Sequence, residues 1–284
     1  MPKFSIDHRT EYHYSERVSL GPHRLMLRPR ESRELRLISN KISTWPAADL
    51  SWAQDVFGNA LATATFKKET DNLVIESETT LELESAAWPV FPIAARAANY
   101  PFSYSDDERT DLGALLTMQH PDPTRRLSAW AASFVMNNPT DTLALLKDLN
   151  AGISATASYQ ARDEEGTQSP TRTLDLGRGS CRDFALLFVE AARALGFGAR
   201  AVSGYIFNPS LNSSPGTTHA WAEVFVPGAG WITFDPTNRR MGGFNLIPVA
   251  VARDLRQATP ISGSFLSRSS NTARLQVAVH VKQI

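Results

Sequence analysis

The strongest constraint on the fold is that the spacing of apolar residues changes twice along the chain. Through the first 84 residues the period is two, and in FSIDHRTEYHYS one parity holds Phe4, Ile6, His8, Thr10, Tyr12 and Tyr14. Charged and polar residues hold the other parity, so this pattern predicts half-buried strands. Gly58 and Asn59 mark a turn between two later alternating runs. Short strands separated by turns are typical of a β-sandwich.

Helical spacing replaces this alternation in the middle of the chain. Asp122-Pro123 predicts one helix start and Thr140 or Asp141 another, and the run YQARDEEGTQSPTRTLDLGRG predicts a polar loop. Strands return in ARAVSGYIF, HAWAEVFV and GWITFDPT, and ARLQVAVHVK closes the chain. The order predicts an α+β protein, in which an N-terminal β-sandwich domain with a connecting segment (1–110) precedes a core of helices and antiparallel sheet (111–284).

Composition narrows the classes of partner. Lys+Arg and Asp+Glu both number 29, so the net charge is zero and the basic surface expected of a nucleic-acid-binding protein is missing. No run approaches the roughly 18 apolar residues of a membrane span, and the start of the chain lacks the apolar segment of a signal peptide. A single cysteine excludes an intramolecular disulfide. We therefore expect a cytoplasmic protein that binds neither nucleic acid nor membrane.

The single cysteine, Cys181, lies where a helix is expected to begin. Ser180 and Asp183 fit a capping box, and Gly196 is a natural C-cap. The apolar stripe between them holds Phe184, Leu187, Phe188, Ala191 and Leu195. The unpaired N–H groups and the positive dipole end of such a helix favour a thiolate and can stabilise an oxyanion. Taken alone, however, a lone cysteine is more often an inert small hydrophobe.

A nucleophilic thiolate needs a base, and the base needs an orienting group. Among the six histidines, His219 opens the strand HAWAEVFV, and Asp235 ends the following strand WITFD. The other five are interpreted as surface or packing residues, namely His8, His13, His23, His120 and His280. The segment PGAG between the two strands predicts a hairpin, which brings His219 and Asp235 to one end.

The parity of these two residues adds a further expectation. Direct pairing of Val226 with Trp231 would place His219 and Asp235 on opposite faces of the sheet. We therefore predict an odd-length hairpin loop, a bulge, or an Asp235 just beyond regular pairing. Asp235 before Pro236 has a second interpretation, because Asp in this position often only caps a turn.

The blocks around these residues resemble the bacterial transglutaminase-like family. They are GRGSCRDFALLFVEAARALGFGARAVSGYIF, THAWAEVFVPGAGWITFDPTN and ARDLRQATPISGSF, and DVFGNA with the first strands is similar to the family's N-terminal domain. The resemblance implies an N-terminal β-domain joined to a papain-like transglutaminase core. It implies Cys181 as nucleophile, His219 as base and Asp235 as the residue that orients His219. The implied chemistry is acyl transfer on a peptide or isopeptide amide through a thioester, without cofactor or metal.

The chain also departs from the animal transglutaminases. Those enzymes carry Gln-Cys-Trp at the nucleophile, whereas this chain has Ser180-Cys181-Arg182 and no EF-hand-like calcium loop. These differences favour hydrolysis by a protease or amidase over amine cross-linking. Tyr159 is a candidate for the second oxyanion donor, and equally for an aromatic residue packed under a loop. The segments 160–178 and 208–218 are expected to line the cleft.

Two other functions remain open on the sequence. One is a non-catalytic module that binds a peptide or protein on the same scaffold, since a fold does not imply a function. The other is a metal site formed by Cys181, His219 and Asp235, which would lack the fourth protein ligand of a structural zinc site. The sequence indicates neither the substrate nor the oligomeric state.

Overall fold

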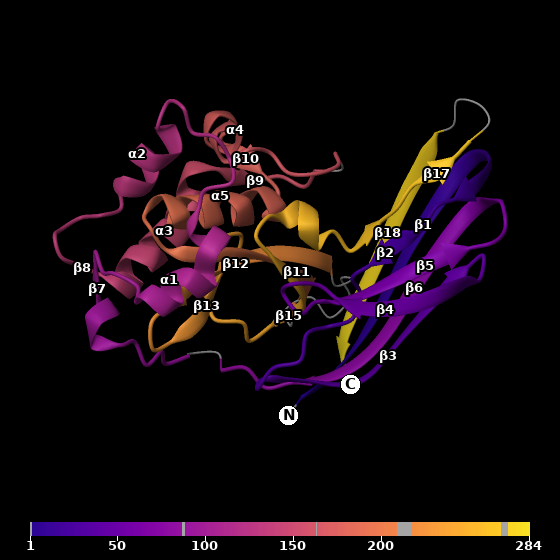
Figure 1. Cartoon of the computed structure of the whole chain (residues 1–284), viewed down its shortest axis with the longest axis horizontal. Helices are drawn as coiled ribbons and strands as arrows, with labels where there is room; N and C mark the ends of the chain where they lie inside the picture. Colours follow the sequence, from indigo (N-terminus) through magenta and orange to yellow (C-terminus); the bar gives the residue numbers. More distant parts are fainter. Residues whose placement is uncertain (1, 87–88, 163, 209–216, 268–271) are drawn as a thin grey trace.

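The N-terminal strands form a β-sandwich beside a mixed core (Figure 1). The structure, a computed structural model, describes residues 2–86, 89–162, 164–208, 217–267 and 272–284. One sheet has the order β17-β1-β6-β3 with β18 also on β1, and the other has the order β16-β2-β5-β4. The strands are β1 (Lys3–Leu20), β2 (His23–Leu25), β3 (Leu35–Trp45), β4 (Ala48–Gln54), β5 (Ala60–Phe66), β6 (Thr70–Leu83), β16 (Ile261–Ser262), β17 (Phe265–Leu266) and β18 (Ala273–Gln283).

The alternation of the first strand matches its burial. Along β1, Phe4, Ile6, His8 and Thr10 are buried, whereas Asp7 and the other residues of opposite parity are wholly or partly exposed. The predicted turn at Gly58 and Asn59 is present between β4 and β5, with Gly58 at φ +71°. The β-sandwich predicted from period-two alternation is therefore confirmed.

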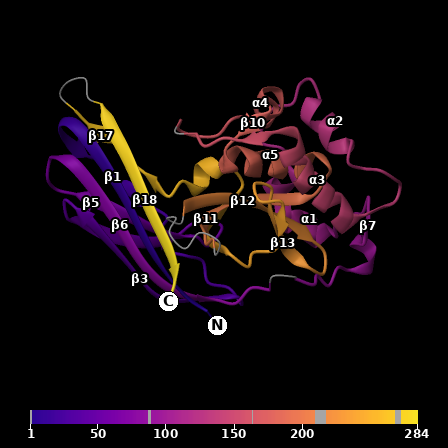
Figure 2. The same ribbon diagram turned by 180° about the vertical axis from the view of Figure 1, so that it is seen from behind.

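The end of the chain corrects the expected domain limits. We assigned 111–284 to the core, but β18 pairs antiparallel with β1 from Phe4↔Gln283 to Tyr14↔Ala273. β16 and β17 also join sandwich strands, and Figures 1 and 2 both show yellow β18 lying along indigo β1. Alternation predicts that a segment is a strand but not which sheet completes its hydrogen bonds. The core therefore lies within the chain, and both ends of the chain belong to the sandwich.

The core consists of helices packed on a five-stranded antiparallel sheet of order β14-β13-β12-β11-β15. Helix α5 packs on β11 and β12. The helices are α1 (Asp106–Leu112), α2 (Arg126–Ala132), α3 (Thr142–Thr156), α4 (Pro170–Leu176) and α5 (Cys181–Ala194), with 3-10 turns η1 (Ala95–Ala97), η2 (Gly113–Leu116) and η3 (Leu255–Ala258). The core strands are β7 (Asn99–Tyr100), β8 (Thr140–Asp141), β9 (Ser158–Tyr159), β10 (Arg178–Gly179), β11 (Gly198–Ile206), β12 (Thr217–Val226), β13 (Gly230–Asp235), β14 (Arg240–Met241) and β15 (Leu246–Ala252).

The helix predictions differ from the structure in three places. Helix α1 was not expected, because most of it falls in the connecting segment assigned to 1–110. Residues 159–179, expected to be a loop, contain α4, with Ser169 as its N-cap and Pro170 in its first turn. Ser169 and Pro170 are typical of a helix start, but the many polar residues around them led to the prediction of a loop. Helix α2 begins at Arg126 and not at the predicted Asp122-Pro123, and the Asp122 carboxylate accepts hydrogen bonds from the backbone N–H groups of Leu127 and Ser128 in its first turn. The helix capped by Asp141 is present as predicted.

The sandwich packs against the β11–β15 side of the core sheet. The Asn59 side chain exchanges two hydrogen bonds with the Val251 backbone, at 2.7 and 2.9 Å. His8 contacts Tyr205 through a 2.8 Å hydrogen bond, and burial lowers the pKa of His8 to about 4. Apolar residues of both parts form one cluster, including Phe4, Ile6, Leu81, Val279, Tyr205, Ile247 and Val249. The turn at Asn59 thus fixes the position of the sandwich on the core.

Among the described residues, no helix is long and apolar enough to cross a membrane.

Candidate active site

Cys181 is the first residue of α5, and its partly buried thiol lies at the helix N-terminus. The predicted capping contact is present, because the Ser180 backbone N–H donates to Asp183 Oδ2 at 2.8 Å. The helix ends at Ala194 with Leu195 as its C-cap, and the following Gly196 has φ +87°. The thiol is therefore held beside the unpaired N–H groups of the first helical turn.

Asp183 also connects the start of α5 to the preceding loop. Its carboxylate accepts a hydrogen bond from the Gln168 backbone N–H at 2.7 Å and lies 2.9 Å from Arg162 Nε. The Asp183 side chain is fully buried, so these contacts are shielded from solvent. One carboxylate thus caps the helix that carries Cys181 and contacts both Arg162 and Gln168 beside it.

The hairpin of β12 and β13 brings His219 and Asp235 to one face. Val226 pairs with Gly230 and Ala222 with Phe234, so the loop is the three residues 227–229. This odd length gives the two residues the same parity relative to the sheet, which confirms the predicted register. His219 Nε2–H donates to Asp235 Oδ2 at 2.9 Å, and their side chains are only 5% and 1% exposed.

Asp235 is fixed by a turn that the sequence analysis did not assign to the site. Asn238 donates from Nδ2 to Asp235 Oδ2 at 2.6 Å, and the backbone N–H groups of Thr237 and Asn238 donate to Oδ1. Burial alone would raise the pKa of Asp235, but hydrogen bonds from His219 and Asn238 and the nearby imidazole charge lower it overall. The carboxylate is therefore ionised, and the available signal was the Asp-Pro-Thr-Asn turn sequence itself.

His219 lies between Asp235 and Cys181. Burial favours a neutral imidazole, but hydrogen bonds to Asp235 and Cys181 and their negative charges outweigh it and raise the pKa of His219 to about 9. Since Nε2 of His219 is hydrogen-bonded to Asp235, Nδ1 is the ring nitrogen available for a hydrogen bond with the Cys181 thiol. The Trp221 ring stacks on the imidazole with centroids 6.1 Å apart, which fixes its plane. Together these contacts favour the protonated, imidazolium form of His219.

Tyr159 is placed near the same thiol by a short parallel pairing of β9 with β10, in which it lies opposite Gly179. Burial raises the pKa of Tyr159, and so does the negative charge of Cys181, whereas Arg182 lowers it. Its side chain is 56% exposed, so it is not packed under a loop. The phenol lies close enough to Cys181 for the role of oxyanion donor to be tested.

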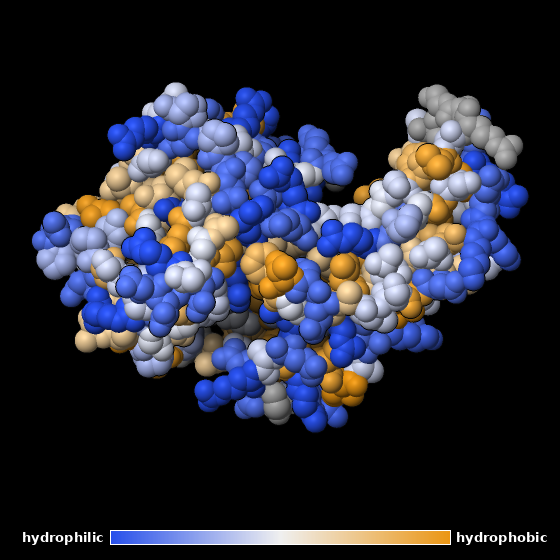
Figure 3. Space-filling model, in the orientation of Figure 1, coloured by the Kyte–Doolittle hydropathy of each residue, from blue (hydrophilic) through white to orange (hydrophobic). Residues whose placement is uncertain are grey.

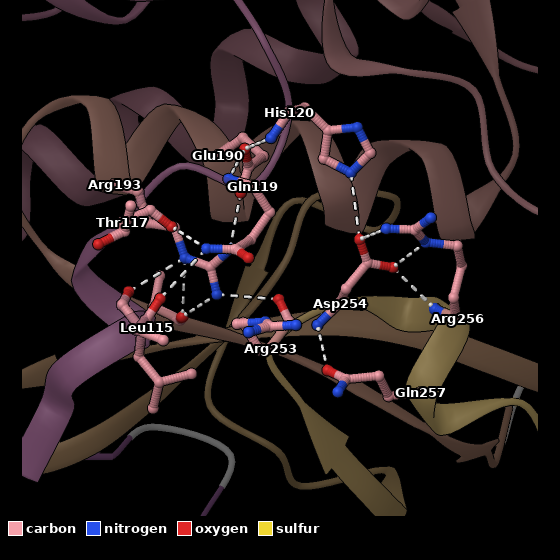
Figure 4. Close-up of polar contacts among 12 residues, drawn as sticks. Leu115, Thr117, Gln119, His120, Glu190, Arg193, Arg253, Asp254, Arg256 and Gln257 are labelled. Atoms are coloured by element: carbon pink, nitrogen blue, oxygen red, sulfur yellow. Dashed lines mark hydrogen bonds and ion pairs between the residues drawn. The ribbon is translucent and has the colours of Figure 1, made fainter.

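The far end of α5 is anchored by a buried ion pair that the sequence analysis missed (Figure 4). Glu190 and Arg193 are fully buried, and Arg193 Nη1 lies 2.7 Å from Glu190 Oε1. Glu190 Oε2 accepts from the backbone N–H groups of Gln119 and His120. Arg193 donates to the carbonyl oxygens of Leu115, Ala199 and Arg253. The helix that carries Cys181 is thus fixed at both ends by buried carboxylates.

The other sequence expectations for the site have mixed outcomes. Within the part of the chain that the structure describes, no group of three or more His, Cys, Asp or Glu side chains is arranged to hold a metal ion. Most of the expected cleft segment 208–218 lies outside the described residues. Of the other histidines, His120 lies by Asp254 and His8 in the sandwich contact, away from Cys181.

Known proteins share both the sequence pattern and the fold. A model of the bacterial transglutaminase-like N-terminal region matches residues 4–82, and a model of the transglutaminase-like superfamily matches residues 128–236. An uncharacterized protein of Mycobacterium tuberculosis is 28% identical over 301 residues, covering 98% of this chain and 92% of the relative. One from Mycobacterium leprae is 25% identical over 289 residues and covers both chains fully.

A solved structure extends the likeness to the whole fold. The crystal structure of a candidate cysteine protease from Cytophaga hutchinsonii has a TM-score of 0.78 and 19% identity. It covers 100% of this chain and 91% of its own length. The second family match contains Cys181, His219 and Asp235. From the two matches and the shared fold we conclude that the chain belongs to the bacterial transglutaminase-like family, with that family's N-terminal region followed by a transglutaminase-like core.

Proposed function

We propose that the protein is a cysteine enzyme that cleaves peptide or isopeptide amides through Cys181, His219 and Asp235. The observation that carries the proposal is that His219 is hydrogen-bonded to both Asp235 and Cys181. Asp235 holds Nε2 of His219 at 2.9 Å, which leaves Nδ1 for a thiol at a helix N-terminus. An orienting carboxylate, a base and a nucleophile in this order are the parts that nucleophilic acyl transfer requires.

The first half of the reaction forms a thioester. The Cys181 sulfur attacks the amide carbonyl carbon, and the carbonyl electron pair moves to oxygen. The oxyanion lies beside the backbone N–H groups at the start of α5, and Tyr159 can supply a second donor. His219 then gives its proton to the leaving nitrogen as the C–N bond breaks. The amine leaves, and the acyl group stays on Cys181.

The second half releases the acyl group to water. His219 accepts a proton from water while the water oxygen attacks the thioester carbonyl carbon. Collapse of the tetrahedral intermediate expels the Cys181 thiolate and frees the acid, which restores the initial ion pair. Partial exposure of Cys181 and Tyr159 gives water the access to the thioester that hydrolysis requires. The name of the Cytophaga structure, a candidate cysteine protease, supports hydrolysis over amine capture.

The proposal is tested first at the thiol. Intact-mass analysis should show that iodoacetamide modifies Cys181 much faster in the wild type than in a His219→Ala variant near neutral pH. Cys181→Ala is the control for labelling at other sites. Equal rates in the wild type and His219→Ala would mean an unassisted thiol, and would favour a non-catalytic binding module on this scaffold.

The fate of the acyl group is tested with peptide amide and isopeptide libraries. Acid-quenched wild type should carry a hydroxylamine-sensitive acyl adduct, and Cys181→Ala should carry none. Adding a fluorescent primary amine then separates the two acceptors. Release of the free acid in the presence of the amine supports hydrolysis. Transfer of the acyl group to the amine would instead mean that the enzyme is a transglutaminase.

A further inference from the structure

A polar cavity of about 590 Å³ opens beside the start of the catalytic helix, between the loop after β9, helix α4 and β10. Its lining includes Arg162, Gln168, Arg172, Arg178 and Gly179. Two peptide units separate Gly179 from Cys181, so their Cα atoms lie within about 8 Å. The volume falls in the range of about 300–1,000 Å³ that is typical of ligand pockets. The cavity is therefore large enough for a ligand and adjacent to the nucleophile.

The charges around this cavity are unbalanced. Three arginines line it, against the single carboxylate of Glu164. Arg162 is already engaged, because its Nε lies 2.9 Å from the buried Asp183 carboxylate. Arg172 and Arg178 have exposed side chains and form no ion pair with a carboxylate of the described residues. Two guanidinium groups therefore remain for a ligand.

Uncharged groups in the lining add a second polar feature. Gln168 Oε1 is buried without a hydrogen-bond donor among the described residues. Figure 3 shows a mostly hydrophilic surface on the part of the core that faces the sandwich across a notch. A ligand that brings both carboxylate oxygens and an N–H group would satisfy the free guanidinium groups and this acceptor.

We propose that this cavity binds an acidic side chain of the substrate, so that the preferred acyl donors are peptides with Asp or Glu close to the scissile amide. Guanidinium groups bind carboxylates through paired hydrogen bonds, and a recessed site strengthens their field. The inference rests on the proposed function, because proximity to Cys181 is what assigns the cavity to the substrate. It adds a class of substrate that the catalytic residues do not specify.

The test compares two alkylating reagents of nearly the same shape. Iodoacetate carries a carboxylate and iodoacetamide is neutral. The rate at Cys181 with iodoacetate divided by the rate with iodoacetamide therefore reports the attraction of an anion to the site. Each rate is measured by intact mass and divided by the rate with glutathione. The double variant Arg172→Gln/Arg178→Gln should lower the ratio about tenfold relative to the wild type. Arg24→Gln, an exposed arginine of β2 on the sandwich, is the matched control and should leave it unchanged.

The outcomes separate the two levels of the proposal. An unchanged ratio in the double variant, with Cys181 still reacting fast with iodoacetamide, would overturn the acidic-substrate inference and leave the proposed function standing. If Cys181 of the wild type reacts with iodoacetamide no faster than Cys181 of the His219→Ala variant, the proposed function itself is contradicted. Both altered side chains are exposed, so the double variant should fold, and circular dichroism checks this.

A binding measurement gives a readout without turnover. On a Cys181→Ala background, a fluorescent peptide with a central Glu should bind about tenfold tighter than the same peptide with Gln. The Arg172→Gln/Arg178→Gln pair should remove that difference, and higher salt should reduce it. Equal affinity for the two peptides on the Cys181→Ala background would refute a carboxylate-binding cavity.

Discussion

Replacing Glu190 by glutamine should loosen the helix that carries Cys181. In the native protein Oε2 accepts from two backbone N–H groups at 2.7 and 2.8 Å, and Oε1 lies 2.7 Å from Arg193 Nη1. The glutamine amide keeps one oxygen and turns the other into a donor. That donor must face either Arg193 or the two backbone N–H groups, so at least one buried donor loses its acceptor. Arg193 also loses its buried counter-charge.

These losses set the expected magnitude. A buried hydrogen-bonding group left unsatisfied costs about 1–3 kcal/mol, and breaking a buried ion pair by removing one partner costs about 3–5 kcal/mol. We expect Glu190→Gln to lower the free energy of opening of α5 by about 3–5 kcal/mol. Amide hydrogen exchange of α5 fragments, read by mass spectrometry, should then be about 10²- to 10⁴-fold faster.

A surface ion pair provides the control. Arg126 Nε lies 2.6 Å from Asp175 Oδ1, but both side chains are more than half exposed. Asp175→Asn should therefore change stability by no more than about 1 kcal/mol, because solvent screens such pairs. Exchange in α5 of Glu190→Gln within tenfold of the wild-type rate would show that burial does not strengthen the Glu190 contacts as argued.

Three further predictions concern the site and the domain contact. The imidazolium proton of His219 should be lost near pH 9 in an NMR titration, and at lower pH in Asp235→Asn. The contribution of the protonated His219 to folding stability should be complete below about pH 6.5 and should disappear as the pH rises through about 9. Identical titrations would contradict this. Asn59→Ala leaves two buried backbone groups of Val251 unpaired and should cost about 2–6 kcal/mol, with faster exchange of the Val251 amide as the check. Tyr159→Phe should lower kcat by about 10²-fold with little change in KM if the phenol binds the oxyanion, whereas unchanged kcat would remove that role.

Much of the site was predictable because its determinants are local. The N-cap of α5, the position of Cys181 in its first turn and the Gly196 end depend on residues within one or two helical turns. The shared face of His219 and Asp235 followed from parity alone, and the three-residue hairpin loop agrees with it. Periodicity and turn signals act over a few residues, so a sequence can be read for them directly.

The remaining features depend on contacts between distant residues. Charged residues such as Glu190 and Arg193 are normally found on a solvent-exposed helix face. In the structure α5 is covered on nearly all sides, and the pair is buried against the 115–120 loop and Arg253.

By itself, the sequence determined the period-two strands of the sandwich, the helices α3 and α5, the position of the thiol on α5, and the hairpin shared by His219 and Asp235. Only the tertiary structure decided that β18 completes the N-terminal sheet, that Asn238 secures Asp235, and that two arginines border a cavity next to Cys181. The reason is physical: backbone periodicity and capping are settled by neighbours in the chain, whereas strand partners, burial of charge and cavity shape are settled by which surfaces meet.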